Sequence, residues 1–120
     1  MIRKIIFTIM IFSFFSNLSA DYHKLAYDFN FRGLDGNQIN LKDYDNKVIV
    51  VVNVASRCGY TPQYEDLQTI WSDYKDKGLI IIGVPTNNFK QEPGSNAEIK
   101  KFCETNFGIS FPITEKTNVT

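Results

Sequence analysis

An unbroken apolar run at residues 48–52 constrains the fold of this chain more than any other feature. All of its residues are β-branched, and the run is too short for a buried helix, so we expect a central strand covered on both faces. A polar loop carrying Cys58 follows, and Thr61 and Pro62 then suit the N-cap and first position of a helix. The pattern predicts a cysteine at the C-terminal edge of a central strand, where ligands bind in open α/β sheets.

The position of Cys58 predicts a reactive thiol. The thiolate is the nucleophilic form of cysteine, and the free N–H groups at a helix N-terminus favour it. A lone cysteine is more often a small core residue, but Ser56, Arg57 and Gly59 make this loop polar. Thr61 stands where a C-x-x-C motif would need its second cysteine, so a local disulfide is excluded.

A helix and a second strand follow the cysteine loop. Residues 79–84 form another apolar run, and Gly78 is placed to end the intervening helix. A strand, helix and strand within residues 48–84 predict a right-handed βαβ unit with adjacent parallel strands. The apolar residues at helical spacing are expected to be core rather than a cofactor site, and they are Tyr64, Leu67, Ile70, Trp71 and Tyr74.

The flanking segments predict a hairpin and a second helix. Residues 29–32 and 37–41 suit two antiparallel strands, with a glycine-containing turn at 33–36. Ser95 or Asn96 can cap a helix at 97–106, and Glu98 would complete a capping box with Ser95. Phe111 begins another extended segment.

Residues 1–20 have the pattern of a secretory signal peptide. Arg3 and Lys4 precede an apolar stretch at 5–15, which is short for a membrane span, and small residues suit cleavage after Ala20. An uncleaved anchor is the alternative. We therefore expect a periplasmic or secreted protein, a mature domain at residues 21–120 and no stable membrane association after cleavage. In an oxidising compartment a structural disulfide between Cys58 and Cys103 is also possible.

Composition excludes several other classes. Hydrophobic residues make up 43% of the 120 residues and the formal net charge is zero, which argues against disorder and against nucleic-acid binding. His23 is the sole histidine and stands apart from both cysteines. We expect neither a metal site nor a bound cofactor.

The cysteine loop resembles the glutathione peroxidase family. Residues 53–61 read N-V-A-S-R-C-G-Y-T and match the family motif N-V-A-S-K/R-C-G-F/Y-T at every position, in its cysteine form. Ala55 instead departs from the T-x-x-C motif of peroxiredoxins. Residues 84–96 resemble F-P-C-N-Q-F-x-x-Q-E-P-G-S-N, with Thr86 for cysteine, Asn88 for glutamine and one residue fewer before Gln91.

The resemblance extends over roughly residues 27–119 and implies an α/β thioredoxin-like fold with an N-terminal β-hairpin. The C-terminal strands and helix of the family, with its catalytic Trp-Asn pair, have no counterpart here, so we expect an incomplete domain. Trp71 belongs to the first helix and does not replace that tryptophan.

The resemblance also implies a thiol peroxidase acting on hydrogen peroxide and organic hydroperoxides. By this resemblance Cys58 is the peroxidatic residue, and Gln91 is the glutamine that donates a hydrogen bond to the reactive sulfur. Cys103 is the resolving cysteine of the thioredoxin-dependent branch of the family. A thioredoxin-like protein or glutathione would be the reductant. The alternatives are a secreted binding or sensor domain with a permanent Cys58–Cys103 disulfide, or an inactive fragment that does not fold.

Overall fold

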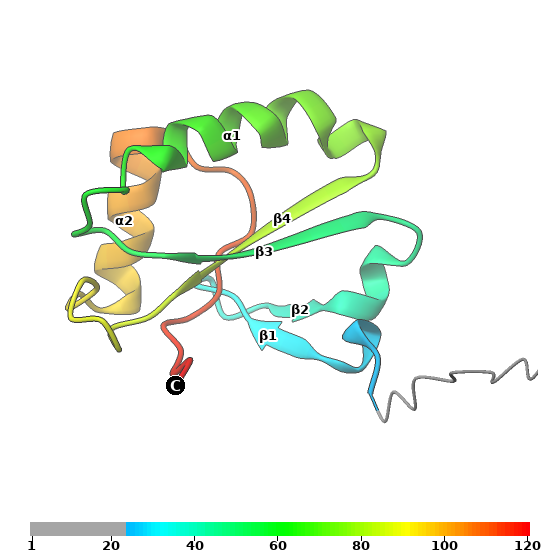
Figure 1. The fold of residues 1–120 in the computed structure, drawn as a ribbon, viewed down its shortest axis with the longest axis horizontal. Helices are drawn as coiled ribbons and strands as arrows, with labels where there is room; N and C mark the ends of the chain where they lie inside the picture. Colours follow the sequence, from blue (N-terminus) through cyan, green and yellow to red (C-terminus); the bar gives the residue numbers. More distant parts are fainter. Residues whose placement is uncertain (1–23) are drawn as a thin grey trace, which may run out of the picture.

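The computed structural model describes residues 24–120, so the predicted signal peptide at 1–20 lies outside the described residues (Figure 1). The elements in chain order are β1 (Asn30–Arg32), β2 (Gln38–Asn40), β3 (Val48–Val54), α1 (Gln63–Tyr74), β4 (Leu79–Pro85) and α2 (Asn96–Phe107). Short 3-10 turns lie at Ala26–Asp28, Leu41–Tyr44 and Lys75–Lys77. No helix in this part of the chain is long and apolar enough to cross a bilayer.

The predicted βαβ unit is confirmed. Strands β3 and β4 pair in parallel, from Val48 opposite Leu79 to Val54 opposite Pro85, and α1 connects them. On its other side β4 pairs with the segment that follows α2, because the Gly83 N–H donates to the Pro112 carbonyl at 2.9 Å. That segment, predicted from Phe111, is extended and bridges β4 without forming a longer strand.

The prediction that β3 is covered on both faces is wrong. Strand β4 is buried along almost its whole length, whereas Val48 and Val51 in β3 remain 66% and 50% exposed. Among the described residues β3 has β4 as its hydrogen-bonded neighbour and none on the opposite edge. The second apolar run, in β4, is therefore the more central strand of the sheet.

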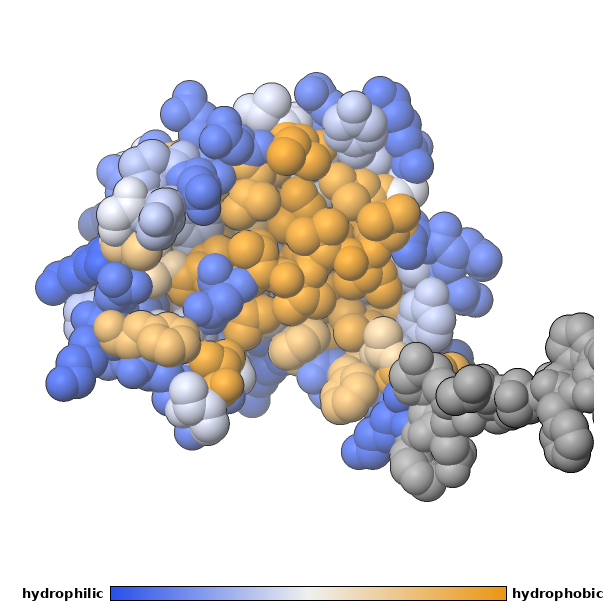
Figure 2. All heavy atoms as spheres, viewed as in Figure 1, coloured by the Kyte–Doolittle hydropathy of each residue, from blue (hydrophilic) through white to orange (hydrophobic). Residues whose placement is uncertain are grey.

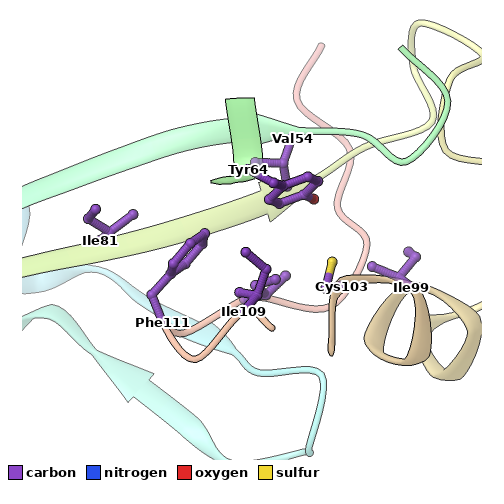
Figure 3. Close-up of a cluster of buried hydrophobic side chains, with 8 residues drawn as sticks. Val54, Tyr64, Ile81, Ile99, Cys103, Ile109 and Phe111 are labelled. Atoms are coloured by element: carbon purple, nitrogen blue, oxygen red, sulfur yellow. The ribbon is translucent and has the colours of Figure 1, made fainter. Parts of the chain in front are cut away.

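Two apolar clusters cover the faces of this sheet. The helix-side cluster joins α1 and α2 to the sheet, and its buried members are Val54, Tyr64, Ile81, Ile99, Cys103, Ile109, Phe111 and Ile113 (Figure 3). The hairpin-side cluster consists of Ile39, Leu41, Ile80, Ile82 and Val84. Figure 1 shows the corresponding layers, with α1 on one side of β3 and β4 and the β1–β2 hairpin on the other.

The predicted apolar stripe of α1 is confirmed in part. Tyr64 is buried, and Leu67 and Trp71 pack partly against the clusters. Ile70 and Tyr74 are exposed, so their assignment to the core is wrong. No described strand lies beyond β3, so the sheet under α1 ends there. It therefore buries fewer of the apolar residues of α1 than their helical spacing predicts.

The predicted hairpin turn, the glycine that ends the helical segment after β3 and the cap of α2 are confirmed. Strands β1 and β2 pair antiparallel around a turn in which Gly36 has φ of 82°. Gly78, with φ of 93°, ends the 3-10 turn that extends α1. Ser95 forms the expected capping box at the start of α2, where its Oγ accepts from the Glu98 N–H at 3.3 Å.

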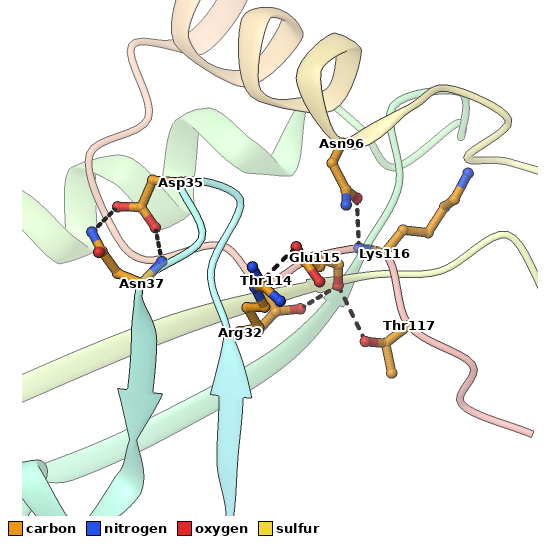
Figure 4. A network of polar contacts seen from close by, with 8 residues as sticks. All are labelled: Arg32, Asp35, Asn37, Asn96, Thr114, Glu115, Lys116 and Thr117. Carbon is orange, nitrogen blue, oxygen red and sulfur yellow. Dashed lines mark hydrogen bonds and ion pairs between the residues drawn. The ribbon is translucent and has the colours of Figure 1, made fainter.

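Polar contacts hold the last described segment against the hairpin and α2 (Figure 4). Arg32 Nε lies 3.5 Å from Glu115 Oε1, and the Glu115 N–H donates to the Arg32 carbonyl at 2.7 Å. The Lys116 N–H donates to Asn96 Oδ1 at 2.9 Å, at the first turn of α2. These bonds set the position of the extended segment beside β4.

Candidate active site

A tight turn between β3 and α1 presents Cys58. The Thr61 hydroxyl accepts from the Cys58 N–H at 3.0 Å and donates to the Ala55 carbonyl at 2.9 Å. The prediction that Thr61 caps α1 is therefore wrong, because its hydroxyl is engaged within the turn. Pro62 is the N-cap of α1 and makes no side-chain capping bond.

Cys58 is a free, half-buried thiol. The Tyr60 N–H points at its sulfur, with a nitrogen-to-sulfur distance of 3.4 Å. A hydrogen bond from a backbone N–H is stronger to a charged acceptor than to a neutral one. This donor therefore lies within reach of any negative charge that develops on the sulfur.

The loop that carries Gln91 lies against the cysteine turn. The Arg57 N–H donates to the Gln91 carbonyl at 3.0 Å. Cys58, Gln91 and Asn53 line a common hollow of about 110 Å³, which is called the Cys58 hollow below. The structure thus brings together two of the predicted site residues although 33 positions separate them in the sequence.

Glu92 joins the two loops and was missed by the sequence analysis. Its carboxylate is buried and accepts from both the backbone N–H and the hydroxyl of Ser56, at 2.7 and 2.9 Å. A glutamate in a polar loop suggests a solvated side chain, so the sequence offers little sign of this burial. The one local signal is that Glu92 directly follows Gln91.

The shortened loop before Gln91 turns through Lys90. Lys90 has φ of 59°, and its N–H donates to the Asn87 carbonyl at 2.9 Å. Asn87 Oδ1 in turn accepts from the Glu92 N–H at 3.1 Å. This left-handed residue reverses the chain, so the loop reaches the cysteine turn with one residue fewer.

The two other departures from the family pattern form a contact of their own. The buried Thr86 hydroxyl donates to the Asn88 side chain. The Asn88 side-chain amide then donates to Asn118 and Thr120, at 2.8 and 2.7 Å. Both residues therefore position the last described segment, and neither lines the Cys58 hollow.

Cys103 lies apart from this site. It is 1% exposed in the helix-side cluster, and burial raises the pKa of its thiol (Figure 3). It lines a different cavity of about 390 Å³, together with Lys100, Ile109 and Phe111. The structure therefore does not place Cys103 beside Cys58, and both thiols are free.

No metal site is formed by residues 24–120, because nowhere in that range do three His, Cys, Asp or Glu side chains gather around one point. The polar groups that line the Cys58 hollow are the thiol, the side-chain amides of Asn53, Gln63 and Gln91, and the hydroxyls of Thr61 and the tyrosines.

The sequence of this chain is similar to those of known proteins. The family model described as glutathione peroxidase matches residues 26–120. The chain is 44% identical over 103 residues to the hydroperoxy fatty acid reductase gpx1 of Synechocystis sp., a match that covers 85% of this chain and 61% of that protein. It is 48% identical to the glutathione peroxidase-like peroxiredoxin gpx1 of Schizosaccharomyces pombe, with 78% of this chain and 60% of that protein covered.

The fold is also shared more widely. A thioredoxin family protein from Chlorobium tepidum, described as a thiol:disulfide interchange protein, superposes with a TM-score of 0.63 at 18% identity, covering 74% of this chain and 57% of that one. The expected thioredoxin-like fold is therefore confirmed. The chain spans about 60% of the length of the curated relatives it matches. On the family match and these identities, the chain belongs to the glutathione peroxidase family.

Proposed function

We propose that this chain is a thiol peroxidase that reduces hydrogen peroxide and organic hydroperoxides at Cys58. The observation that carries the proposal is the Tyr60 N–H aimed at the half-buried Cys58 sulfur, in a hollow that also contains Gln91. The names of the relatives, a hydroperoxy fatty acid reductase and a glutathione peroxidase-like peroxiredoxin, support the same reaction class.

The first step is a nucleophilic displacement on oxygen. The Cys58 thiolate attacks the terminal oxygen of the hydroperoxide, an S–O bond forms and the O–O bond breaks. The leaving oxygen takes a proton and departs as an alcohol or as water, and Cys58 becomes a sulfenic acid. Gln91 is proposed to donate a hydrogen bond from its amide, which would stabilise the thiolate and the charge that develops on oxygen.

Cys103 is proposed to resolve this sulfenic acid. Its thiolate would attack the Cys58 sulfur, a disulfide would form, and the hydroxyl group would leave as water after taking a proton. Because Cys103 is buried in α2, we propose that this helix opens so that the two Cα atoms can come within the 7 Å or so that a disulfide needs. A thioredoxin-like dithiol or glutathione would then return two electrons by thiol–disulfide exchange.

The proposed setting is the periplasm or the outside of the cell. The pattern of residues 1–20 supports export, with removal of the signal peptide after Ala20. A peroxidase in that compartment would depend on a reductant that is present there.

The test measures thiol loss in the reduced full chain under a small excess of hydrogen peroxide, with intact-mass analysis and a circular dichroism spectrum to verify folding. We expect oxidation faster than that of free cysteine at the same pH, ending in a Cys58–Cys103 disulfide. Cys58→Ser should abolish the fast phase. Cys103→Ser should keep it and stop at the sulfenic acid. A folded chain that oxidises no faster than free cysteine would show that the proposal is wrong.

A further inference from the structure

The side-chain amides that line the Cys58 hollow differ in what they already bind. Among the described residues they belong to Asn53, Gln63 and Gln91. The Asn53 amide donates to the Val84 carbonyl at 2.8 Å and is therefore held against β4. Within residues 24–120 the side chains of Gln63 and Gln91 make no hydrogen bond, so both amides can donate to a molecule that enters the hollow.

The backbone of Gln63 is attached to the turn that carries the reactive sulfur. Gln63 is the first residue of α1, and its N–H donates to the Tyr60 carbonyl at 2.9 Å. The Tyr60 N–H in turn points at the Cys58 sulfur. The Gln63 side chain is exposed, so only its own torsions remain to be ordered when a substrate binds.

The displacement on oxygen needs hydrogen-bond donors at two positions. The attacking sulfur, the attacked oxygen and the leaving oxygen lie roughly in line, and negative charge passes from the first atom to the last. The Tyr60 N–H is directed at the sulfur. Gln63 reaches the hollow from α1 and Gln91 from the loop between β4 and α2, so side-chain donors from two elements surround the space for the hydroperoxide.

We infer that Gln63 is a further catalytic residue, whose side-chain amide donates a hydrogen bond to the leaving oxygen of the hydroperoxide. The inference rests on the proposed peroxidase function. The Cys58 thiolate supplies the electron pair, the S–O bond forms and the O–O bond breaks. The leaving oxygen takes its proton from water, and Gln63 supplies a hydrogen bond but no proton.

The test compares Gln63→Met with the unmodified side chain in a full chain that carries Cys103→Ser, so that only the first step is followed. Oxidation of Cys58 is timed by rapid quenching and intact mass. With tert-butyl hydroperoxide we expect the rate to fall about tenfold, the size of one lost hydrogen bond to a charged group. With peracetic acid it should fall less than about threefold, because a carboxylate leaves readily without a donor.

Gln38→Met is the matched control, since it makes the same change at an exposed position of β2. It should leave both rates unchanged. Gln63→Glu is a second variant that keeps the shape of the side chain and suits the first turn of a helix, so it should not lower stability. Its carboxylate would repel the charge on the leaving oxygen, and oxidation by tert-butyl hydroperoxide should be slower than in Gln63→Met.

The pH dependence of Cys58 alkylation by iodoacetamide shows where the amide acts. We expect the same profile with and without Gln63→Met, because the donor serves the leaving oxygen and not the sulfur. A profile moved to higher pH, with equal losses for both oxidants, would place the amide at the sulfur and overturn the inference.

Two outcomes separate this inference from the peroxidase proposal. If the chain with both glutamines intact oxidises no faster than free cysteine, the peroxidase proposal fails and the role of Gln63 fails with it. If that chain oxidises rapidly and Gln63→Met or Gln63→Glu matches the Gln38→Met control, the peroxidase proposal stands and only the role of Gln63 is refuted.

Discussion

At the scale of single residues, the cysteine turn is defined by the partners of its backbone N–H groups. Those of Ser56, Arg57 and Cys58 are taken by the Glu92 carboxylate, the Gln91 carbonyl and the Thr61 hydroxyl. The Tyr60 N–H remains directed at the sulfur. The turn is therefore held in place by its neighbours while one donor is left for the reactive group.

Glu92→Ala tests how much this turn depends on the buried carboxylate. The change removes two hydrogen bonds and leaves the Ser56 N–H without a partner, so we expect the free energy of unfolding to fall by about 2–4 kcal/mol. Peroxide oxidation of Cys58 should slow as the turn loosens. Urea denaturation and the thiol-loss assay measure the two effects.

Glu65→Ala is the control for this prediction, because Glu65 is an exposed glutamate in the first turn of α1. It should lower stability by less than about 1 kcal/mol. Equal effects of the two substitutions would contradict the structural importance of the Glu92–Ser56 contact.

At the scale of elements, α2 controls access to Cys103. The helix begins with the Ser95 capping box and ends at Gly108, whose φ is 57°. The Lys116 ammonium donates to the Gly94 carbonyl at 2.6 Å, just ahead of the first turn. Because Cys103 faces the core, the free energy of opening this helix sets how often its thiol becomes accessible.

Ser95→Ala should make that opening easier. Removing a capping hydroxyl costs about 1 kcal/mol, so we expect Cys103 to react with a small thiol reagent about fivefold faster. The measurement is the labelling rate in a Cys58→Ser background. Ser72→Ala, the same substitution at an exposed position of α1, should leave the rate unchanged. Unaltered labelling in Ser95→Ala, despite lower stability, would show that the first turn of α2 does not gate Cys103.

At the scale of the whole molecule, the unpaired edge of β3 presents an apolar surface. Figure 2 shows apolar side chains gathered over this part of the described chain. Val48, Val50 and Val51 are exposed there, and no described strand pairs with the outer edge of β3. An exposed apolar edge strand favours association between chains.

Val51→Lys should reduce such association. A lysine on an edge strand opposes edge-to-edge pairing, so we expect the chain to remain monomeric at higher concentration in light scattering and size-exclusion chromatography. Its urea midpoint should change little, because Val51 is half exposed. Gln38→Lys adds the same charge at an exposed position of β2 and should not have this effect. Equal behaviour of both variants would attribute the change to net charge alone.

The sequence predicted the elements that depend on near neighbours. The β-branched run predicted β3, the Ser95–Glu98 pair predicted the cap of α2, and Gly78 predicted the end of the helical segment after β3. Each of these features is set by residues a few positions apart. The order strand, cysteine turn, helix and strand followed from the same patterns.

Tertiary structure alone decided which groups became buried and which partners they found. Ser56 and Glu92 are 36 positions apart, so no local pattern pairs them. The exposure of β3, the place of Thr61 within the turn and the separate cavity of Cys103 likewise depend on what packs alongside. Hydrogen bonding and burial are settled by neighbours in space, whereas propensity and capping act along the chain. This is why the sequence determined the elements and the turn that carries Cys58, but not the groups that pack against either cysteine.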